Sequence, residues 1–170
     1  MRKIHTINQY FNEHNSLVNT KLNHNFQNWF GRSKTLKGGV PLVFLHGTNE
    51  KFNEFSKKRR GAFGIGYYFT TDPREASGYG SKIMRVYLKI ENPASTQDVQ
   101  NIMTDIPDVR YLDDYELATK TTELLIEKGH DGLLFTYPNS DLLAMVINES
   151  QIKSIDNKGL WDITNNNIYE

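Results

Sequence analysis

The order in which short apolar segments follow one another is the feature that most constrains this fold. Apolar residues at helical spacing, such as Leu17, Leu22 and Phe26, predict an N-terminal helical segment within residues 1–30. Strands are predicted over 41–45, 67–70, 83–90, 131–137 and 142–148, and helices after Asp72, after Ser95 and after either Asp113 or Asp114. Because strands and helices do not alternate one by one, the pattern favours an α+β fold over a doubly wound sheet.

Length and composition exclude several function classes. A chain of 170 residues is the size of one domain, so we expect residues 1–170 to form a single unit. There are no cysteines, which excludes thiolate catalysis, cysteine-based zinc sites and disulfides. Twenty basic and twenty acidic residues cancel, so no general attraction to nucleic acid or an anionic membrane is expected. No membrane span or signal peptide is visible, which indicates a cytoplasmic location.

The first candidate site is His46-Gly47-Thr48, which follows the predicted strand over 41–45. A strand end places side chains at the rim of a sheet, where ligands can reach them. Gly47 has no side chain, so a flat ligand can approach its backbone closely. Taken alone, His46 is better explained as a histidine that hydrogen-bonds a loop carbonyl.

The second candidate site is the segment Gly66-Tyr67-Tyr68-Phe69-Thr70, with Tyr79 eleven residues after Tyr68. Two tyrosines at the two ends of a short helix can hold a planar heteroaromatic ring between them. The alternative is a pair of ordinary core tyrosines. The glycines that precede Tyr67 are not a dinucleotide fingerprint, because they follow a loop and no helix begins after them.

Together, these motifs resemble the His-Tyr-Glu type of ADP-ribosyltransferase, which includes diphtheria toxin and the poly(ADP-ribose) polymerases. They are more closely similar to the ADP-ribosyltransferase domains of phage polyvalent proteins. The resemblance extends over about residues 26–162 and also includes Trp29–Lys34, Gly129–Gly132 and Gln151–Ser154. It implies a split β-sandwich surrounded by helices, NAD as co-substrate, and no metal.

The resemblance assigns roles to five residues. His46 would hydrogen-bond a ribose hydroxyl of NAD, and Thr48 would support the same loop. Gly47 would hold the nicotinamide carboxamide through its backbone. Tyr68 and Tyr79 would stack on the nicotinamide ring. His46 and Tyr68 are therefore expected in the catalytic set.

Two further NAD-binding candidates depend on this topology. Ser77 lies one position from the serine that many relatives place against the carboxamide, and Ala76 occupies that position here. The basic run over 57–60 lies in the loop expected to cover the NAD site, so Arg60 is a candidate for the pyrophosphate. A solvated charge run and a nucleic-acid contact are the alternatives.

The acidic residue is where this sequence departs from the family. Relatives commonly place a glutamate eight residues before the glutamine that corresponds to Gln151, and here that position is Leu143. Asp141 lies two residues earlier, on the same face if the strand includes it, and is the predicted catalytic acid. Glu149 lies beyond the far end of the strand. The alternatives are that no protein carboxylate serves or that the chain is inactive.

The resemblance implies a mono-ADP-ribosyltransferase that releases nicotinamide and modifies a macromolecular acceptor. A host protein inside a bacterial cell is the expected acceptor of a phage-encoded enzyme, and a nucleic acid is the alternative acceptor. Three other readings are an NAD-binding or ADP-ribose-binding module without turnover, an NAD glycohydrolase, and a protein that blocks a partner by surface contact.

Overall fold

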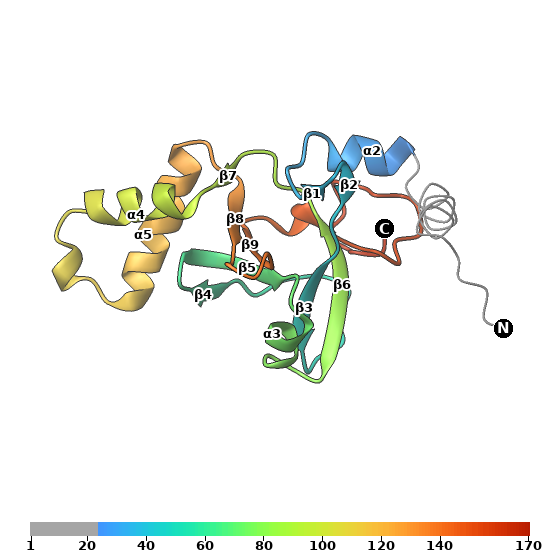
Figure 1. The fold of residues 1–170 in the computed structure, drawn as a ribbon, viewed down its shortest axis with the longest axis horizontal. Helices are drawn as coiled ribbons and strands as arrows, with labels where there is room; N and C mark the ends of the chain where they lie inside the picture. Colours follow the sequence, from blue (N-terminus) through green and yellow to red (C-terminus); the bar gives the residue numbers. More distant parts are fainter. Residues whose placement is uncertain (1–23) are drawn as a thin grey trace.

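The computed structural model describes residues 24–170 (Figure 1). Of the predicted N-terminal helical segment, residues 24–30 are helical, and the remainder lies outside the described residues. The helices are α2 (His24–Phe30), α3 (Pro73–Ser77), α4 (Thr96–Asp105) and α5 (Asp114–Glu127), with 3-10 turns η1 (Val109–Tyr111) and η2 (Glu149–Gln151). The strands are β1 (Leu36–Lys37), β2 (Val40–Pro41), β3 (Phe44–Thr48), β4 (Arg59–Gly61), β5 (Gly64–Thr70), β6 (Lys82–Leu88), β7 (Pro93–Ala94), β8 (Gly132–Thr136), β9 (Leu142–Val146) and β10 (Ile152–Ser154).

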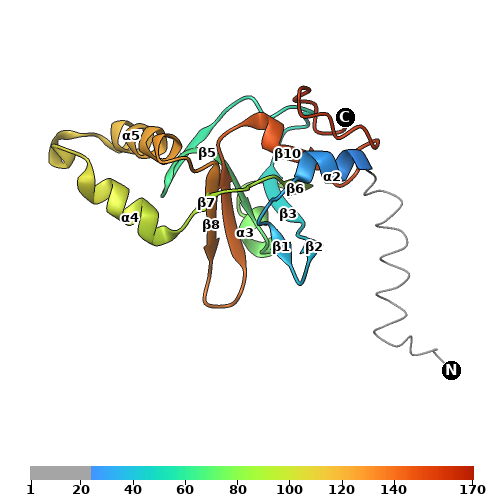
Figure 2. The same ribbon diagram turned by 90° about the horizontal axis from the view of Figure 1, so that it is seen from above.

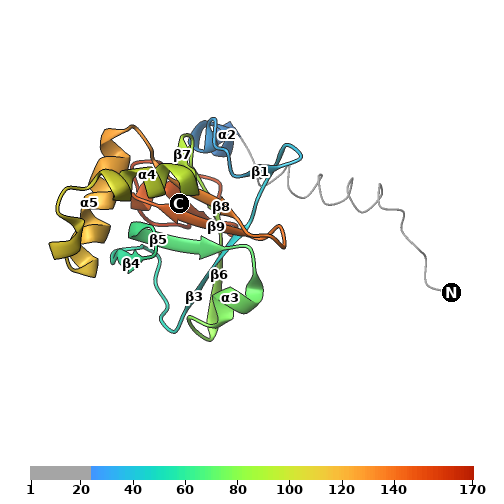
Figure 3. The same ribbon diagram turned by 60° about the vertical axis from the view of Figure 1, so that its left-hand side comes forward.

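The main sheet is divided into two halves that meet at one point. Its strand order is β10-β6-β3-β5-β9-β8-β7, with β4 paired to β5. Strands β3 and β6 pair over five residues, whereas β3 and β5 share the single registered pair Leu45 and Thr70. The two halves diverge from this pair, as Figure 3 shows for β3 and β5. The predicted α+β class with a split sheet is therefore confirmed.

Strand β3 begins three residues later than predicted. The predicted strand over 41–45 starts at Pro41, but this residue pairs with Leu36 in the separate β1–β2 hairpin. The main strand begins at Phe44, because pairing with β6 runs from Phe44 to Thr48. His46 and Gly47 consequently lie within a paired strand instead of after it.

The two faces of the sheet carry different residues, because successive side chains of a strand point to opposite sides. Tyr68 and Thr70 of β5 share one face with Leu143 of β9, which lies directly opposite Thr70. We call this the tyrosine face. The ring of His46 lies 5.3 Å from that of Phe69, between centroids, on the opposite side. We call this the histidine face.

Each face has its own core. The core of the histidine face consists of Phe44, Phe55, Tyr67, Phe69, Val86, Leu88, Ile90, Ala144, Val146, Ile152 and Ile168. The core of the tyrosine face consists of Ala94, Val99, Ile102, Leu125, Leu133, Met145 and Ile147, and buries the inner sides of α4 and α5. Figure 2 shows these two helices at one end of the molecule and α2 with the C-terminal segment at the other. Helix α3 lies beside β3, away from α4 and α5 (Figure 1).

The predicted helix starts are confirmed by their N-caps, and of the two candidates at α5 the cap is Asp113. The Asp72 side chain accepts a hydrogen bond from the first turn of α3. Ser95 and Asp98 form a reciprocal capping box at α4, and Asp113 and Glu116 form another at α5. These local bonds satisfy backbone N–H groups that have no partner within the helix.

The carboxamide of Gln151 ties three strand ends together. Its oxygen accepts from the backbone N–H groups of Ile147, at 3.1 Å, and Asn148, at 2.8 Å. Its nitrogen donates to the carbonyls of Lys89, at 2.8 Å, and Asp131, at 2.7 Å. Gln151 is buried, so water cannot replace these bonds. This side chain therefore joins the ends of β6, β8 and β9.

We predict that Gln151→Ala lowers the free energy of unfolding by about 3 kcal/mol, because up to four backbone groups lose their partner. Urea denaturation measures this change. Gln97→Ala is the matched control, because Gln97 is exposed on α4 and makes one side-chain bond to Asn101. The control should change stability by less than about 0.5 kcal/mol. Equal effects of the two substitutions would contradict the assignment.

Candidate functional site

His46 bridges the two halves of the sheet. Its Nδ1 lies 2.9 Å from the carbonyl oxygen of Tyr68 on β5. A carbonyl only accepts, so Nδ1 carries the proton, and in the neutral ring Nε2 is left as the acceptor. The interpretation of His46 as a carbonyl-bonded histidine is thus correct in part, but the carbonyl belongs to the second candidate motif. One bond brings the two motifs together.

The surroundings of His46 favour its neutral form. Its ring contacts Phe55 at 5.1 Å and Phe52 at 6.4 Å, between centroids. Burial lowers the pKa of His46, the carbonyl bond opposes this effect, and the positive charge of Arg59 lowers the pKa further. A neutral imidazole with a free Nε2 can accept a hydrogen bond from a hydroxyl group.

Gly47 is required because α3 packs directly against β3. A Cβ atom at Gly47 would overlap the carbonyl oxygen of Ala76 and lie 3.2 Å from the Cβ of Tyr79. This close packing places Tyr79 beside the His-Gly-Thr strand, with 73% of its surface exposed. The ring of Tyr79 is therefore available to a ligand next to the backbone of Gly47.

Tyr68 is held more firmly than Tyr79. Its hydroxyl donates to the carbonyl of Gly64 at 2.8 Å, and a Cβ at Gly61 would overlap its ring. Burial raises the pKa of Tyr68 to about 12, although a backbone hydrogen bond opposes this. Its side chain also packs against the core of the tyrosine face. Tyr68 is thus a fixed, neutral ring, and Tyr79 is an exposed one.

Thr48 and Ser77 make local hydrogen bonds. The Thr48 hydroxyl accepts from the backbone N–H of Glu50 at 3.1 Å and so orders the chain after β3. The Ser77 hydroxyl donates to the carbonyl of Arg74 at 2.9 Å, within α3, and the residue is exposed. Ala76, at the position that many relatives fill with serine, is buried. The NAD-binding roles of Thr48 and Ser77 stay predictions.

Asp141 lies in the turn that precedes β9, which begins at Leu142. Its carboxylate accepts from the Asn139 side-chain amide at 2.7 Å and from the Thr71 hydroxyl at 3.3 Å. Strand β9 therefore does not include Asp141. The prediction that Asp141 shares a strand face with Leu143 required the strand to include it, so that prediction is wrong. Its catalytic role stays a prediction without that support.

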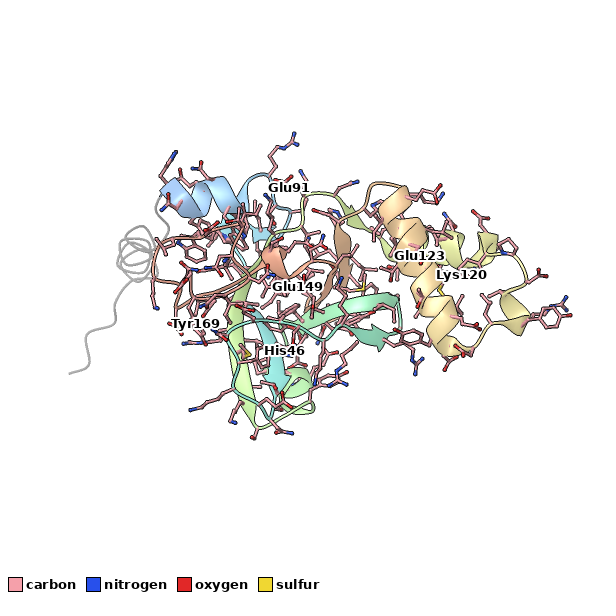
Figure 4. All side chains as sticks on the ribbon, turned by 180° about the vertical axis from the view of Figure 1, so that it is seen from behind. His46, Glu91, Lys120, Glu123, Glu149 and Tyr169 are labelled. Atoms are coloured by element: carbon pink, nitrogen blue, oxygen red, sulfur yellow. The ribbon has the colours of Figure 1, made fainter. Side chains whose placement is uncertain are left out.

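The other acidic candidate, Glu149, lies on the histidine face. Its carboxylate accepts a hydrogen bond from the hydroxyl of Tyr67, a core residue of that face. Burial first, and then this bond, raises the pKa of Tyr67. Figure 4 labels Glu149 and His46, both at the central sheet and away from α5. Glu149 is thus separated by the sheet from the strand position of Leu143.

Arg59 and Arg60, the last two residues of the basic run, act on different parts of the molecule. Arg60 pairs with Asp114 of α5, with 3.2 Å between Nη1 and Oδ2. The positive charge of Arg59, in contrast, acts on His46. Adjacent strand residues point to opposite sides, and both belong to β4, which was predicted as a loop. Arg59 is therefore a candidate for the NAD pyrophosphate that the sequence did not single out. Arg60, the residue that the sequence did single out, pairs with α5 instead.

A cavity of about 620 Å³ lies next to His46. Met84, which lines it, is directly opposite His46 in the β3–β6 pair, and Phe52 contacts the His46 ring. The lining residues are Glu50, Lys51, Phe52, Asn53, Lys82, Met84 and Tyr169. Tyr169, which Figure 4 labels together with His46, belongs to this lining.

Two features were sought in the described part of the chain. Residues 24–170 contain no group of three or more His, Asp or Glu side chains placed to hold a metal ion. None of the helices formed by these residues is long and apolar enough to cross a membrane.

Comparison with known proteins gives one family. Residues 37–161 match the family described as ADP-ribosyltransferase in polyvalent proteins. No curated protein matches the chain. A solved structure described as the crystal structure of an anti-CRISPR protein is 16% identical, with a TM-score of 0.40, and covers 68% of this chain and 94% of that one. A likeness at this level carries no conclusion about function.

The depressed pKa of His46 predicts a pH dependence of stability. The unfolded chain binds this proton near the ordinary pKa of 6.5, whereas the folded protein binds it only at lower pH. The contribution of neutral His46 is therefore complete above pH 6.5 and is lost as the pH falls toward the folded pKa. Between about pH 7.5 and about pH 5.5, wild type should lose more unfolding free energy than His46→Asn, which cannot titrate. Parallel curves in urea denaturation would contradict this.

Proposed function

Since the chain belongs to the family of ADP-ribosyltransferases in polyvalent proteins, we propose that it transfers a single ADP-ribose unit from NAD to a macromolecule and releases nicotinamide. The observation that carries this proposal is the hydrogen bond between His46 and the Tyr68 carbonyl. It joins the two motifs at the point where the sheet divides, and the packing of Gly47 on α3 adds Tyr79 to them.

The nicotinamide ring would lie on the tyrosine face. Tyr68 supplies a fixed ring, Tyr79 supplies an exposed one, and the backbone of Gly47 would hold the carboxamide. The free Nε2 of His46 would accept from a ribose hydroxyl. The cavity beside His46, with Phe52 at its wall, supports placing the adenosine end on the histidine face.

The reaction exchanges one bond at the ribose C1′ atom. The bond from C1′ to the nicotinamide nitrogen breaks, and its electron pair leaves with the ring, which becomes neutral. A lone pair of the acceptor forms the new bond to C1′, and the acceptor releases a proton. Positive charge develops on the ribose in the transition state, so a nearby carboxylate would stabilise it.

Two features of the sequence support a single added ADP-ribose unit and a protein acceptor. Leu143 stands where relatives commonly have the glutamate, so no carboxylate on that strand position can orient a hydroxyl of an attached ADP-ribose. This supports single addition over chain growth. The net charge of zero supports a protein acceptor, with a bacterial host protein in the cytoplasm as the proposed case.

A second candidate function is NAD recognition without turnover. The observation that favours it is again Leu143, because an apolar side chain cannot stabilise the charge that develops on the ribose. In that case, the protein would act by binding NAD or ADP-ribose and a partner.

Incubation with labelled NAD and bacterial lysate separates these functions. We expect nicotinamide release and label on a macromolecule, both lost in His46→Ala. Protease or nuclease sensitivity of the label then identifies the acceptor class. NAD loss without a labelled macromolecule indicates a glycohydrolase, and NAD binding without release indicates the recognition module. Absence of both binding and release would contradict the proposal.

Tyr79→Ala provides a sharper test, because this ring is 73% exposed and contributes little to the core. We expect kcat/KM for nicotinamide release to fall about tenfold, as the loss of one stacking ring predicts. The unfolding free energy should change by less than about 0.5 kcal/mol. Tyr111→Ala is the matched control, because Tyr111 is 80% exposed and lies on η1. Equal rates in the two variants would contradict the stacking role.

A further inference from the structure

The strand position of Leu143 has a defined set of neighbours. Leu143 lies directly opposite Thr70 on one side and Phe135 on the other. All three side chains therefore share the tyrosine face, as does Tyr68, two residues before Thr70. A carboxylate that replaces the missing glutamate has to come from an element that lies over these residues.

The carboxylate of Glu75, on α3, lies there. Its Oε2 accepts from the hydroxyl of Thr70 at 2.6 Å, and its Oε1 is 3.3 Å from the hydroxyl of Tyr137. Tyr137 follows Phe135 by two residues, and their rings lie 4.9 Å apart, so Tyr137 continues the same face. Glu75 is thus anchored to the last residue of β5 and to the residue that follows β8, the two strands that flank Leu143.

The hydrogen-bond donors of Glu75 are themselves fixed. Thr70 accepts a hydrogen bond from the backbone N–H of Asp72 at 3.0 Å, which leaves its own proton for Glu75. Burial first, and then the charge of Glu75, raises the pKa of Tyr137, so its hydroxyl stays protonated. Both groups can therefore donate throughout the neutral range.

The charge of Glu75 is not neutralised by an ion pair. The neighbouring Arg74 pairs with Asp72 instead, with 3.2 Å between Nη2 and Oδ2. Within residues 24–170, none of the salt bridges includes Glu75. The carboxylate is partly buried, so its negative charge is available to a cation that develops beside it.

Its position on α3 also places Glu75 near the residues that would hold the nicotinamide leaving group. The next residue, Ala76, contacts Gly47 of β3, and Tyr79 lies on the chain that follows the helix. A nicotinamide ring held by Gly47, Tyr68 and Tyr79 would place the ribose C1′ beside this segment.

We propose that Glu75 is the catalytic carboxylate of this chain and acts from α3 in place of a residue on β9. This inference rests on the proposed ADP-ribosyl transfer. As the bond from C1′ to nicotinamide breaks and its electron pair leaves with the ring, the negative charge of Glu75 offsets the positive charge on the ribose. As the acceptor lone pair bonds to C1′, the acceptor proton passes to Glu75 and then to solvent.

Glu75→Gln tests this role with little change in shape. The amide oxygen of glutamine can still accept from Thr70, so we expect an unchanged unfolding midpoint and an NAD Kd within about threefold of wild type. The kcat for nicotinamide release should fall roughly a hundredfold. Glu123→Gln, a change of an exposed acid on α5, is the matched control and should keep the wild-type rate. A Glu75→Gln rate above about a third of wild type overturns the proposal.

A second variant moves the carboxylate from α3 to β9. Glu75→Gln combined with Leu143→Glu should release nicotinamide at least about tenfold faster than Glu75→Gln alone, because a carboxylate returns to the same face. A purely structural role of Glu75 predicts no recovery. Asp141→Asn is assayed in parallel, and a loss there with full activity in Glu75→Gln overturns the proposal in favour of Asp141.

Failure of the proposed transfer and destabilisation of Glu75→Gln have to be distinguished from loss of a catalytic carboxylate. If wild type binds NAD but releases no nicotinamide, the proposed transfer itself fails, and the catalytic role of Glu75 fails with it. If Glu75→Gln lowers the unfolding midpoint, Glu75→Asp decides, because it keeps the charge and withdraws the carboxylate by one carbon. A lower kcat at unchanged NAD Kd in Glu75→Asp supports the proposal, and the wild-type kcat overturns it.

Discussion

Strands β3 and β5 separate immediately after the pair Leu45 and Thr70, and the His46 side chain holds them together beyond it. The bond from Nδ1 to the Tyr68 carbonyl, at 2.9 Å, takes the place of a regular ladder bond at the start of the split. It fixes the tautomer of His46 and the backbone of Tyr68 at once. Because both residues belong to the candidate NAD site, the geometry of the site depends on this one interaction.

Helix α3 completes the site because β3 carries a glycine. Without a side chain at Gly47, the carbonyl of Ala76 can approach the strand, and the chain that follows brings Tyr79 beside it. The same short helix places Glu75 over Thr70 and Tyr137. A five-residue helix thus supplies the carboxylate that we propose for catalysis, and the chain directly after it supplies the second aromatic ring.

The elements that depend on neighbouring residues could be predicted from the sequence. Asp72, Ser95 and Asp113 mark helix starts because an N-cap acts within its own first turn. Strand β3 begins later than predicted because Pro41 pairs in a separate hairpin. The local sequence pattern does not indicate which of two strands Pro41 pairs with.

The site was predicted less completely, for the same reason. His46, Tyr68 and Tyr79 follow from motif spacing, and the structure brings the first two into contact. The environment of Glu75 depends on register between β5, β8 and β9, so nothing in the sequence near α3 indicates it. The sequence pointed to Arg60 within the basic run, but the structure pairs Arg60 with Asp114 and brings the charge of Arg59 to His46.

The central claim is that NAD binds where the sheet divides, with its nicotinamide on the tyrosine face. A crystal structure of the protein with a non-hydrolysable NAD analogue tests this most directly. We predict a nicotinamide ring against Tyr68 and Tyr79, its carboxamide on the backbone of Gly47, a ribose hydroxyl on Nε2 of His46, and the carboxylate of Glu75 beside C1′. An analogue bound elsewhere, or a ribose with Glu75 turned away from it, would contradict the account.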